Sequence, residues 1–253
     1  MSMPVALVTG VSRRHGIGFA VAQRLLDDDY CVVTTGWSAH DADQAWGADG
    51  VPPQFEGAAE RHLHYEIDLS ESDAPRKLID VTFQAFRCLD AIVAVQARSS
   101  SQDLGQLTAK ELDLSWAVNV RATLLLIRAF AERHDASLPG RIVLFTSGQH
   151  RTAMPNEIPY AVTKGAVHQM TATLAAAVAG QHITVNTLDP GPTDTGWADA
   201  ATCESVQKTM PSGRWNRPGE IAAVVAWLLS HEAAAVTGQV LDAEEGFRLA
   251  GIS

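Results

Sequence analysis

The sequence has little of what disulfide-bonded, metal-binding and membrane proteins need. Its three cysteines, Cys31, Cys88 and Cys203, form no CxxC pair, so neither a disulfide framework nor a zinc site is indicated, and a reducing compartment is expected. The nine histidines show no HExxH or similar ligand spacing. The apolar runs are too short to span a membrane, and the N-terminus lacks the features of a signal peptide. These absences predict a cytoplasmic protein without a metal site or a membrane partner.

Positive charge is also scarce. The 253 residues carry a formal net charge of −10, and the Lys and Arg residues form no run. A nucleic-acid surface or an anionic membrane is therefore not expected as the main partner. The hydrophobic content of 46% and the charged content of 19% are ordinary for a globular chain, and the length suits one large domain with a substantial core.

Short apolar runs alternate with helical stretches along the chain. Strands are expected at 5–9, 31–35, 62–69, 90–97, 141–147, 183–189 and 239–243. Helices are expected at 19–28, 73–88, 108–134, 158–179 and 218–231, and a capping box of Thr108 and Glu111 opens the longest one. This alternation predicts one Rossmann-like, doubly wound α/β domain over residues 1–253, with about seven parallel strands and helices on both faces.

Two stretches, about 37–60 and about 191–216, lack a regular pattern. In a parallel sheet, long excursions beyond the carboxyl ends of the strands tend to carry function. The second stretch holds Trp197, Met210 and Trp215 among polar residues. It is expected to form a mobile lid over an apolar substrate.

The helix at 158–179 carries Tyr160 and Lys164, which four-residue spacing places on one helix face. A neighbouring ammonium favours the phenolate, so Lys164 is expected to lower the pKa of Tyr160 toward working pH. Tyr160 then becomes a candidate proton donor and acceptor for an alcohol and carbonyl pair. The alternative is a packed ring beside a solvated amine.

The turn after the first strand reads Thr9-Gly10-Val11-Ser12-Arg13-Arg14-His15-Gly16-Ile17-Gly18. Glycines allow a sharp turn and close approach of the backbone to a pyrophosphate, and the following helix presents free N–H groups. The position between a strand and a helix is the one that dinucleotide binding requires.

With these two motifs, the chain resembles the short-chain dehydrogenases/reductases over essentially all its length, most closely the 3-oxoacyl-carrier-protein reductase-like branch. Gly10, Gly16 and Gly18 match the family's TGxxxGxG turn, although the first spacing is five residues instead of three. Gln96 stands within Ala94-Val95-Gln96-Ala97, where the family has NNAG. The other matches are Asp68 and Leu69 after the third strand, and Pro190, Gly191 and Thr193 after the sixth.

The resemblance also implies a complete catalytic set of Asn119, Ser147, Tyr160 and Lys164, with Ser147 thirteen residues before Tyr160. It implies that Tyr160 donates a proton to a carbonyl while a nicotinamide supplies hydride, and that Ser147 holds the carbonyl oxygen. Lys164 would also hold the nicotinamide ribose, and Asn119 would anchor a proton-relaying water. The expected cofactor contacts are Gly10, Ser12, Arg13, Arg14, Gly16, Ile17, Gly18, Trp37, Ser38, Asp68, Leu69, Gln96, Tyr160, Lys164, Pro190, Gly191 and Thr193.

The cofactor is expected to be NADP(H) rather than NAD(H). The second strand ends in Thr34-Thr35-Gly36-Trp37-Ser38, without the acidic residue that NAD readers use, and the first carboxylate after it is Asp41. Arg13 and Arg14 are candidates for a 2′-phosphate. The alternative is that both arginines are solvated and that Asp41 reaches the ribose.

The expected activity is reduction of a 3-oxoacyl or other small carbonyl, or the reverse oxidation. One alternative is a non-catalytic NADP-binding sensor or scaffold of the same fold. Another is dehydration or epimerisation of a nucleotide sugar, for which the chain is short. A homo-oligomer, either a dimer or a homotetramer, is expected because the helix at 158–179 has a face of small residues: Ala161, Gly165, Ala166, Ala172, Ala175 and Ala176. That face would otherwise pack on its own sheet.

Overall fold

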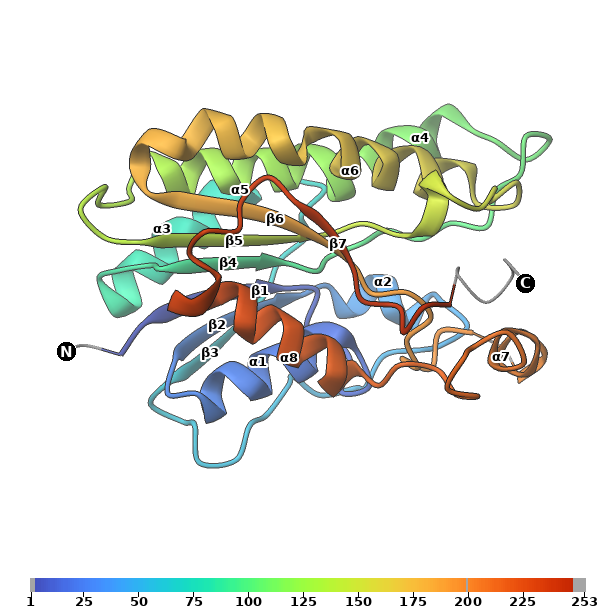
Figure 1. Ribbon diagram of the computed structural model, residues 1–253, viewed down its shortest axis with the longest axis horizontal. Coiled ribbons are helices and arrows are strands. Elements are labelled where there is room, and N and C mark those ends of the chain that lie inside the picture. The colour runs from blue at the N-terminus through green and yellow to red at the C-terminus, as the bar shows by residue number, and fades with distance from the viewer. Residues whose placement is uncertain (1–2, 199, 248–253) are drawn as a thin grey trace.

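A sheet of seven parallel strands forms the centre of the computed structural model, which describes residues 3–198 and 200–247 (Figure 1). Its strand order, β3-β2-β1-β4-β5-β6-β7, reverses direction between β1 and β4. The seven-stranded, doubly wound fold predicted from the sequence is confirmed. In chain order the strands are β1 (Val5–Thr9), β2 (Cys31–Gly36), β3 (His62–Glu66), β4 (Ala91–Ala94), β5 (Gly140–Phe145), β6 (Ile183–Asp189) and β7 (Val240–Asp242).

Helices cover both faces of this sheet. One face carries α3, α5 and α6, and the other carries α1 and α8, which pack against each other (Figure 1). The α-helices are α1 (Ile17–Asp27), α2 (Ser38–Ala42), α3 (Ala74–Phe86), α4 (Ala109–Trp116), α5 (Ala122–Ala131), α6 (Ile158–Val178), α7 (Ala200–Gln207) and α8 (Pro218–Leu229). By length and composition alone Ala109–Ala131 would suffice to cross a membrane, but 56% of its apolar window is buried inside the protein, as in a core helix.

The alternation of side chains along β5 explains why the central strands read as continuous apolar runs. Ile142 and Leu144 join the hydrophobic cluster under α3, α5 and α6, whereas Val143 and Phe145 join the cluster under α1 and α8. A strand buried on both faces needs an apolar side chain at every position. The same two-sided burial fixes the register in which β5 pairs with β4 and β6.

The long helix expected at 108–134 is divided by a π-helical turn, Ala117–Arg121, between α4 and α5. Thr108 caps α4 as predicted, because its Oγ1 accepts a hydrogen bond from the Glu111 backbone N at 3.2 Å. The second half of the predicted capping box is wrong. The Glu111 carboxylate turns away to pair with Arg98, at 2.6 and 2.8 Å.

The two irregular stretches contain short helices, α2 in the first and α7 in the second. Both follow the carboxyl ends of strands, β2 and β6 respectively. Trp197 and Trp215 line the large cavity at this end of the sheet. Met210 does not line that cavity and is buried.

Candidate active site

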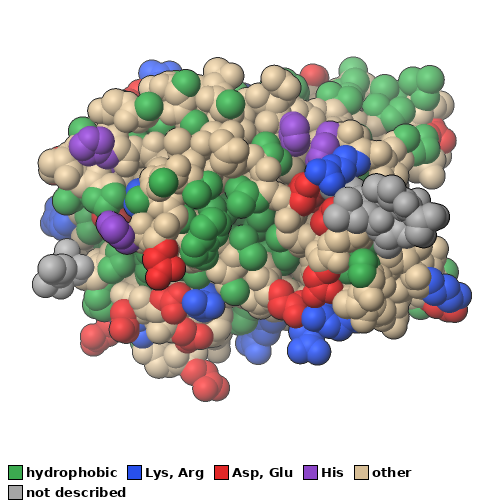
Figure 2. All heavy atoms as spheres, viewed as in Figure 1, with side chains coloured by type: hydrophobic (Ala, Val, Ile, Leu, Met, Phe, Trp, Pro, Cys, Tyr) green, Lys and Arg blue, Asp and Glu red, His purple; other side chains and the backbone are tan. Residues whose placement is uncertain are grey.

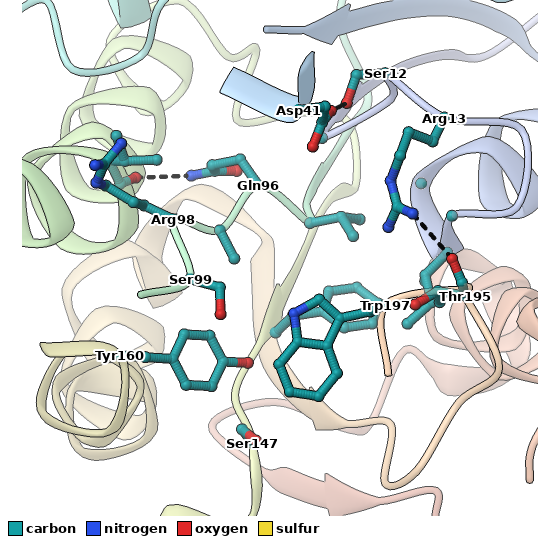
Figure 3. Close-up of a pocket in the computed structure, with 18 of the residues that line it drawn as sticks. Ser12, Arg13, Asp41, Gln96, Arg98, Ser99, Ser147, Tyr160, Thr195 and Trp197 are labelled. Atoms are coloured by element: carbon teal, nitrogen blue, oxygen red, sulfur yellow. Dashed lines mark hydrogen bonds between the residues drawn. The ribbon is translucent and has the colours of Figure 1, made fainter. Parts of the chain in front are cut away.

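A cavity of about 680 Å³ opens at the carboxyl ends of the strands, where the strand order reverses (Figure 3). Ligands of doubly wound folds bind at this switch point. Most of the predicted site residues line the cavity. They are Gly10, Ser12, Arg13, Gly16, Ile17, Gly18, Trp37, Asp68, Leu69, Gln96, Ser147, Tyr160, Lys164, Pro190, Gly191 and Thr193.

Three predicted residues, Arg14, Ser38 and Asn119, are not among those that line the cavity. The Arg14 backbone N donates to an Asp49 carboxylate oxygen at 2.6 Å, outside the cleft. The backbone N and the Oγ of Ser38 donate hydrogen bonds to the Glu66 carboxylate at the end of β3, at 2.9 and 2.6 Å. Asn119 is buried in the π-helical turn.

The turn between β1 and α1 needs glycine at two positions. Gly10 has φ of +70°, and a Cβ there would lie 2.8 Å from the Gln96 backbone N. A Cβ on Gly18 would lie 2.5 Å from the Gly10 carbonyl oxygen. The N-terminus of α1 has neither a side-chain cap nor an acidic residue in its first turn. Its backbone N–H groups therefore suit a phosphate, and this part of the site fits a dinucleotide.

Arg13 points from the widened turn toward Thr195 at one side of the cavity (Figure 3). Its Nη1 donates to the carbonyl oxygen of Thr195 at 3.0 Å, and its guanidinium lies 5.6 Å from the centroid of the Trp46 ring. Trp46 in turn lies 6.4 Å from Trp197, centroid to centroid. Arg13 thus links the glycine-rich turn to the segment expected to form the lid.

Asp41 lies on α2 at the cavity wall with both carboxylate oxygens engaged. One accepts a short hydrogen bond from the Ser12 hydroxyl, and the other accepts from the Trp46 indole Nε1 at 2.9 Å. Only 8% of the residue is exposed. The first carboxylate after β2 therefore faces the nucleotide end of the cavity with two of its acceptor positions occupied.

Tyr160 and Ser147 meet beside the cavity, and the Tyr160 hydroxyl points toward Trp197 on the opposite wall (Figure 3). Burial raises the pKa of the phenol most strongly, a hydrogen bond with Ser147 lowers it, and the charges of Glu157 and Asp189 raise it further. The net result is a pKa of about 12. At neutral pH this phenol carries its proton and can donate it.

Lys164 comes from the next turn of α6 and is 3% exposed. Its Nζ donates to the carbonyl oxygen of Phe145 at 2.9 Å and lies 5.6 Å from the centroid of the Tyr160 ring. Burial lowers the pKa of Lys164 to about 8, although the charge of Asp189 opposes this change. The prediction that Lys164 brings the pKa of Tyr160 below its ordinary value is therefore wrong, because burial of the phenol outweighs any such influence.

Two amides hold the wall behind these groups. Asn119, in the π-helical turn, accepts from the Arg98 backbone N at 2.6 Å and donates to the Arg98 carbonyl and to Thr163 Oγ1. Gln96 accepts a short hydrogen bond from the Thr9 hydroxyl and donates to Thr123 Oγ1 at 2.9 Å. Together these bonds tie the ends of β1 and β4 to α5 and α6.

Sequence reasoning missed four residues that shape this cavity. Arg98 lines the cavity and pairs with Glu111, which lies thirteen residues further along the chain. No local sequence pattern indicates this ion pair. Trp46 belongs to an irregular stretch without periodicity. Asp189 and Glu157 had a signal available, because each directly precedes a segment that the sequence marks as part of the site. Among the residues that the structure describes, no cluster of His, Cys, Asp and Glu could hold a metal ion.

Comparison with known proteins identifies the family. Residues 10–248 match the family profile described as Enoyl-(Acyl carrier protein) reductase. The uncharacterized oxidoreductase YjdA of Bacillus subtilis is 34% identical over 245 residues, which cover 96% of each chain. The chain belongs to the short-chain dehydrogenase/reductase family. It is thus an oxidoreductase, and membership in this family implies that it binds NAD(P).

Solved structures of similar proteins have the same fold, among them a short-chain dehydrogenase/reductase. One from Serratia marcescens is 26% identical and superimposes with a TM-score of 0.82, covering 96% of this chain and 97% of its own. The TT0495 protein of Thermus thermophilus is 28% identical with a TM-score of 0.81, covering 97% and 99%.

Proposed function

We propose that this short-chain dehydrogenase/reductase interconverts a ketone and a secondary alcohol with NADP(H), and that Tyr160 is its acid and base. The observation that carries the proposal is the Tyr160 hydroxyl, which is hydrogen-bonded to Ser147 and faces a cavity whose other end is a dinucleotide-type turn. The bound nicotinamide would supply or accept the hydride at the carbonyl carbon.

In the reductive direction, Tyr160 gives its proton to the carbonyl oxygen as the carbon gains hydride, so the ketone becomes an alcohol. Ser147 donates a hydrogen bond to the same oxygen and holds it in place. Lys164, with a pKa of about 8, restores the proton of Tyr160 at working pH. We also propose that Asn119 anchors a relay water through the second lone pair of Oδ1, because both its amide hydrogens are used within the protein and the first lone pair accepts from the Arg98 backbone N.

The preference for NADP(H) rests on Arg13 and Asp41. Arg13 offers a guanidinium at the nucleotide end of the cavity, where a 2′-phosphate would form charge-assisted hydrogen bonds. The two oxygens of Asp41 already accept from Ser12 and Trp46, which leaves this carboxylate poorly placed to bind a ribose hydroxyl. Measuring kcat/KM with both cofactors tests this, and a strong preference for NAD(H) would overturn it.

The substrate class proposed is a 3-oxoacyl group or another small carbonyl. The matching family profile is named for a reductase of acyl groups, which loosely supports an acyl substrate, and Ser147 beside Tyr160 suits a carbonyl oxygen. A panel of ketones and alcohols followed by nicotinamide absorbance provides the test. If no ketone is turned over, or if Tyr160→Phe leaves turnover unchanged, the proposed function is wrong.

We also propose one domain over residues 1–253, a mobile lid at 191–216, a cytoplasmic location, and a homo-oligomer that is a dimer or homotetramer. Trp116, Leu124 and Val162 are exposed on α4, α5 and α6, and they favour pairing through these helices. Ala175, on the small-residue face of α6, packs in the core instead. A light-scattering mass equal to one chain would contradict the oligomer.

The face shown in Figure 2 mixes acidic and basic side chains, which supports the expectation that nucleic acid is not a partner.

A further inference from the structure

Glu157 brings a carboxylate to the reactive end of the cavity. It directly precedes α6, three residues before Tyr160, and both residues line the cavity. Its backbone is satisfied, because its N donates to Met154 and its carbonyl accepts from Ala161. Within residues 3–198 and 200–247, the structure gives the half-buried Glu157 carboxylate neither a hydrogen bond nor an ion pair.

The electrostatics agree that this carboxylate shares the pocket of the reactive phenol. Burial raises the pKa of Glu157, and the charge of Glu157 contributes to the raised pKa of Tyr160. A carboxylate that loses water without gaining a donor is costly to keep. A substrate that covers Glu157 must therefore supply the missing donor.

The cationic side chains of the lining already have other roles. Arg98 pairs with Glu111, the proposed function assigns Arg13 to the cofactor phosphate, and Lys164 donates to Phe145 beside Tyr160. An anionic substrate group would thus meet Glu157 without a free cation to offset it. A donor carried by the substrate itself is the remaining way to satisfy the carboxylate.

Neutral polar groups and an aromatic ring complete this end of the cavity. The hydroxyls of Ser99 and Ser147 lie on either side of the Tyr160 ring, and the indole of Trp197 lies across from it (Figure 3). Hydroxyl groups along a short carbon chain would find partners here, while the chain itself packs against the indole. For a substrate that carries an ammonium group, the free energy lost by removing its hydration would exceed the free energy gained from an ion pair with the half-exposed Glu157 carboxylate.

We propose that Glu157 is a specificity-determining residue that selects small ketones bearing a hydroxyl group next to the carbonyl, and the corresponding polyols, by accepting a hydrogen bond from that hydroxyl. This inference rests on the proposed ketone and alcohol activity and narrows its substrate class. A 3-oxoacyl chain carries a second acceptor in place of a donor, so Glu157 disfavours it.

The test compares small ketones with different donor and acceptor groups. 1-Hydroxy-2-butanone and 2-butanone differ only in the hydroxyl next to the carbonyl, aminoacetone replaces the hydroxyl of hydroxyacetone by an amine, and ethyl acetoacetate represents the 3-oxo esters. We expect wild-type kcat/KM to favour 1-hydroxy-2-butanone over 2-butanone by about 10- to 100-fold, the value of a hydrogen bond to a charged group. Glu157→Leu should abolish this ratio, and Glu157→Gln, which still accepts a hydrogen bond, should keep part of it.

The ratio separates specificity from other effects of the substitution. A change in the pKa of Tyr160 or in folding alters both substrates alike and cancels in the ratio. Glu232→Gln, on the exposed surface after α8, is the matched control and should leave the ratio unchanged. The role of Glu157 is contradicted, while the proposed ketone activity stands, if 2-butanone, aminoacetone or ethyl acetoacetate is preferred to the hydroxyketones. It is also contradicted if Glu157→Leu keeps the wild-type ratio. If no member of the panel is reduced, the proposed function falls and the inference falls with it.

Discussion

Replacing Lys164 by methionine should stabilise the protein while it abolishes turnover. Lys164 is almost fully buried, and its Nζ makes one described hydrogen bond, to the carbonyl oxygen of Phe145. Methionine has a similar length and no charge, so Lys164→Met fills the same space without the desolvated ammonium. A residue retained at such a cost in stability is expected where the reaction needs its charge.

The size of the effect follows from the pKa of Lys164. Burial lowers this pKa from its ordinary 10.5 to about 8, and the difference between the unfolded and folded chains corresponds to about 3 kcal/mol at neutral pH. Lys164→Met also loses the hydrogen bond to Phe145, which lowers the expected increase in stability by about 1 kcal/mol. The free energy of unfolding of Lys164→Met should therefore exceed that of the wild type by about 2 kcal/mol at pH 7.

The pH dependence gives the sign independently. Between about pH 8 and pH 10.5 the unfolded chain binds the proton that folded Lys164 releases, so this group makes wild-type stability rise with pH across that window. Below about pH 8, Lys164 is protonated in both the folded and the unfolded chain, and the full free-energy cost of burying its ammonium remains. The advantage of Lys164→Met is thus largest at neutral pH and should shrink by about 1 kcal/mol by pH 9.

Urea denaturation of both proteins between pH 6 and pH 9 measures this difference, and unchanged m-values show that the unfolded states are comparable. Lys110→Met, at an exposed position on α4, is the control and should show no such pH-dependent gain. A Lys164→Met variant that is less stable at every pH, or whose advantage does not change with pH, would refute the assignment of a desolvated ammonium.

Three other substitutions test separate parts of the site. Ser147→Ala removes a hydrogen bond that lowers the pKa of the catalytic phenol, so ketone reduction should slow on the order of 10²-fold and its alkaline limb should move to higher pH in a pH–rate profile. Arg13→Leu should reduce kcat/KM with NADPH by about 10-fold or more, whereas Arg14→Leu should change it by less than about 2-fold; equal losses would contradict the role given to Arg13. Gly10→Ala should lower the thermal midpoint through a loss of at least about 1 kcal/mol, because φ is +70° and the backbone is too close, while Gly165→Ala in open space on α6 should not destabilise the protein.

The elements that the sequence predicted well are those determined by local pattern. The apolar run at 5–9 and the one at 183–189 are β1 and β6 with unchanged bounds. Gly10, Gly16 and Gly18 were recognisable from their spacing between a strand and a helix. Strand runs and glycine spacings of this kind involve a few neighbouring residues, so a single sequence contains them.

The features that were not predicted depend on tertiary contacts. Four-residue spacing places Lys164 beside Tyr160, but it cannot show that the ammonium donates to Phe145 or that burial controls the phenol. Glu111 satisfies the capping pattern, yet a partly exposed Arg98 from another segment pairs with its carboxylate. In each case, a long-range partner or the loss of water outweighs the local signal.

The most direct test of the central claim is the Tyr160→Phe variant, measured with an accepted ketone and with dinucleotide binding monitored in parallel. The ring keeps its packing on α6, and only the hydroxyl that faces the cavity is removed. Turnover should fall by about 10²- to 10⁴-fold while NADPH binding stays near the wild-type value. Turnover that equals the wild type would contradict the assignment of Tyr160 as the proton donor.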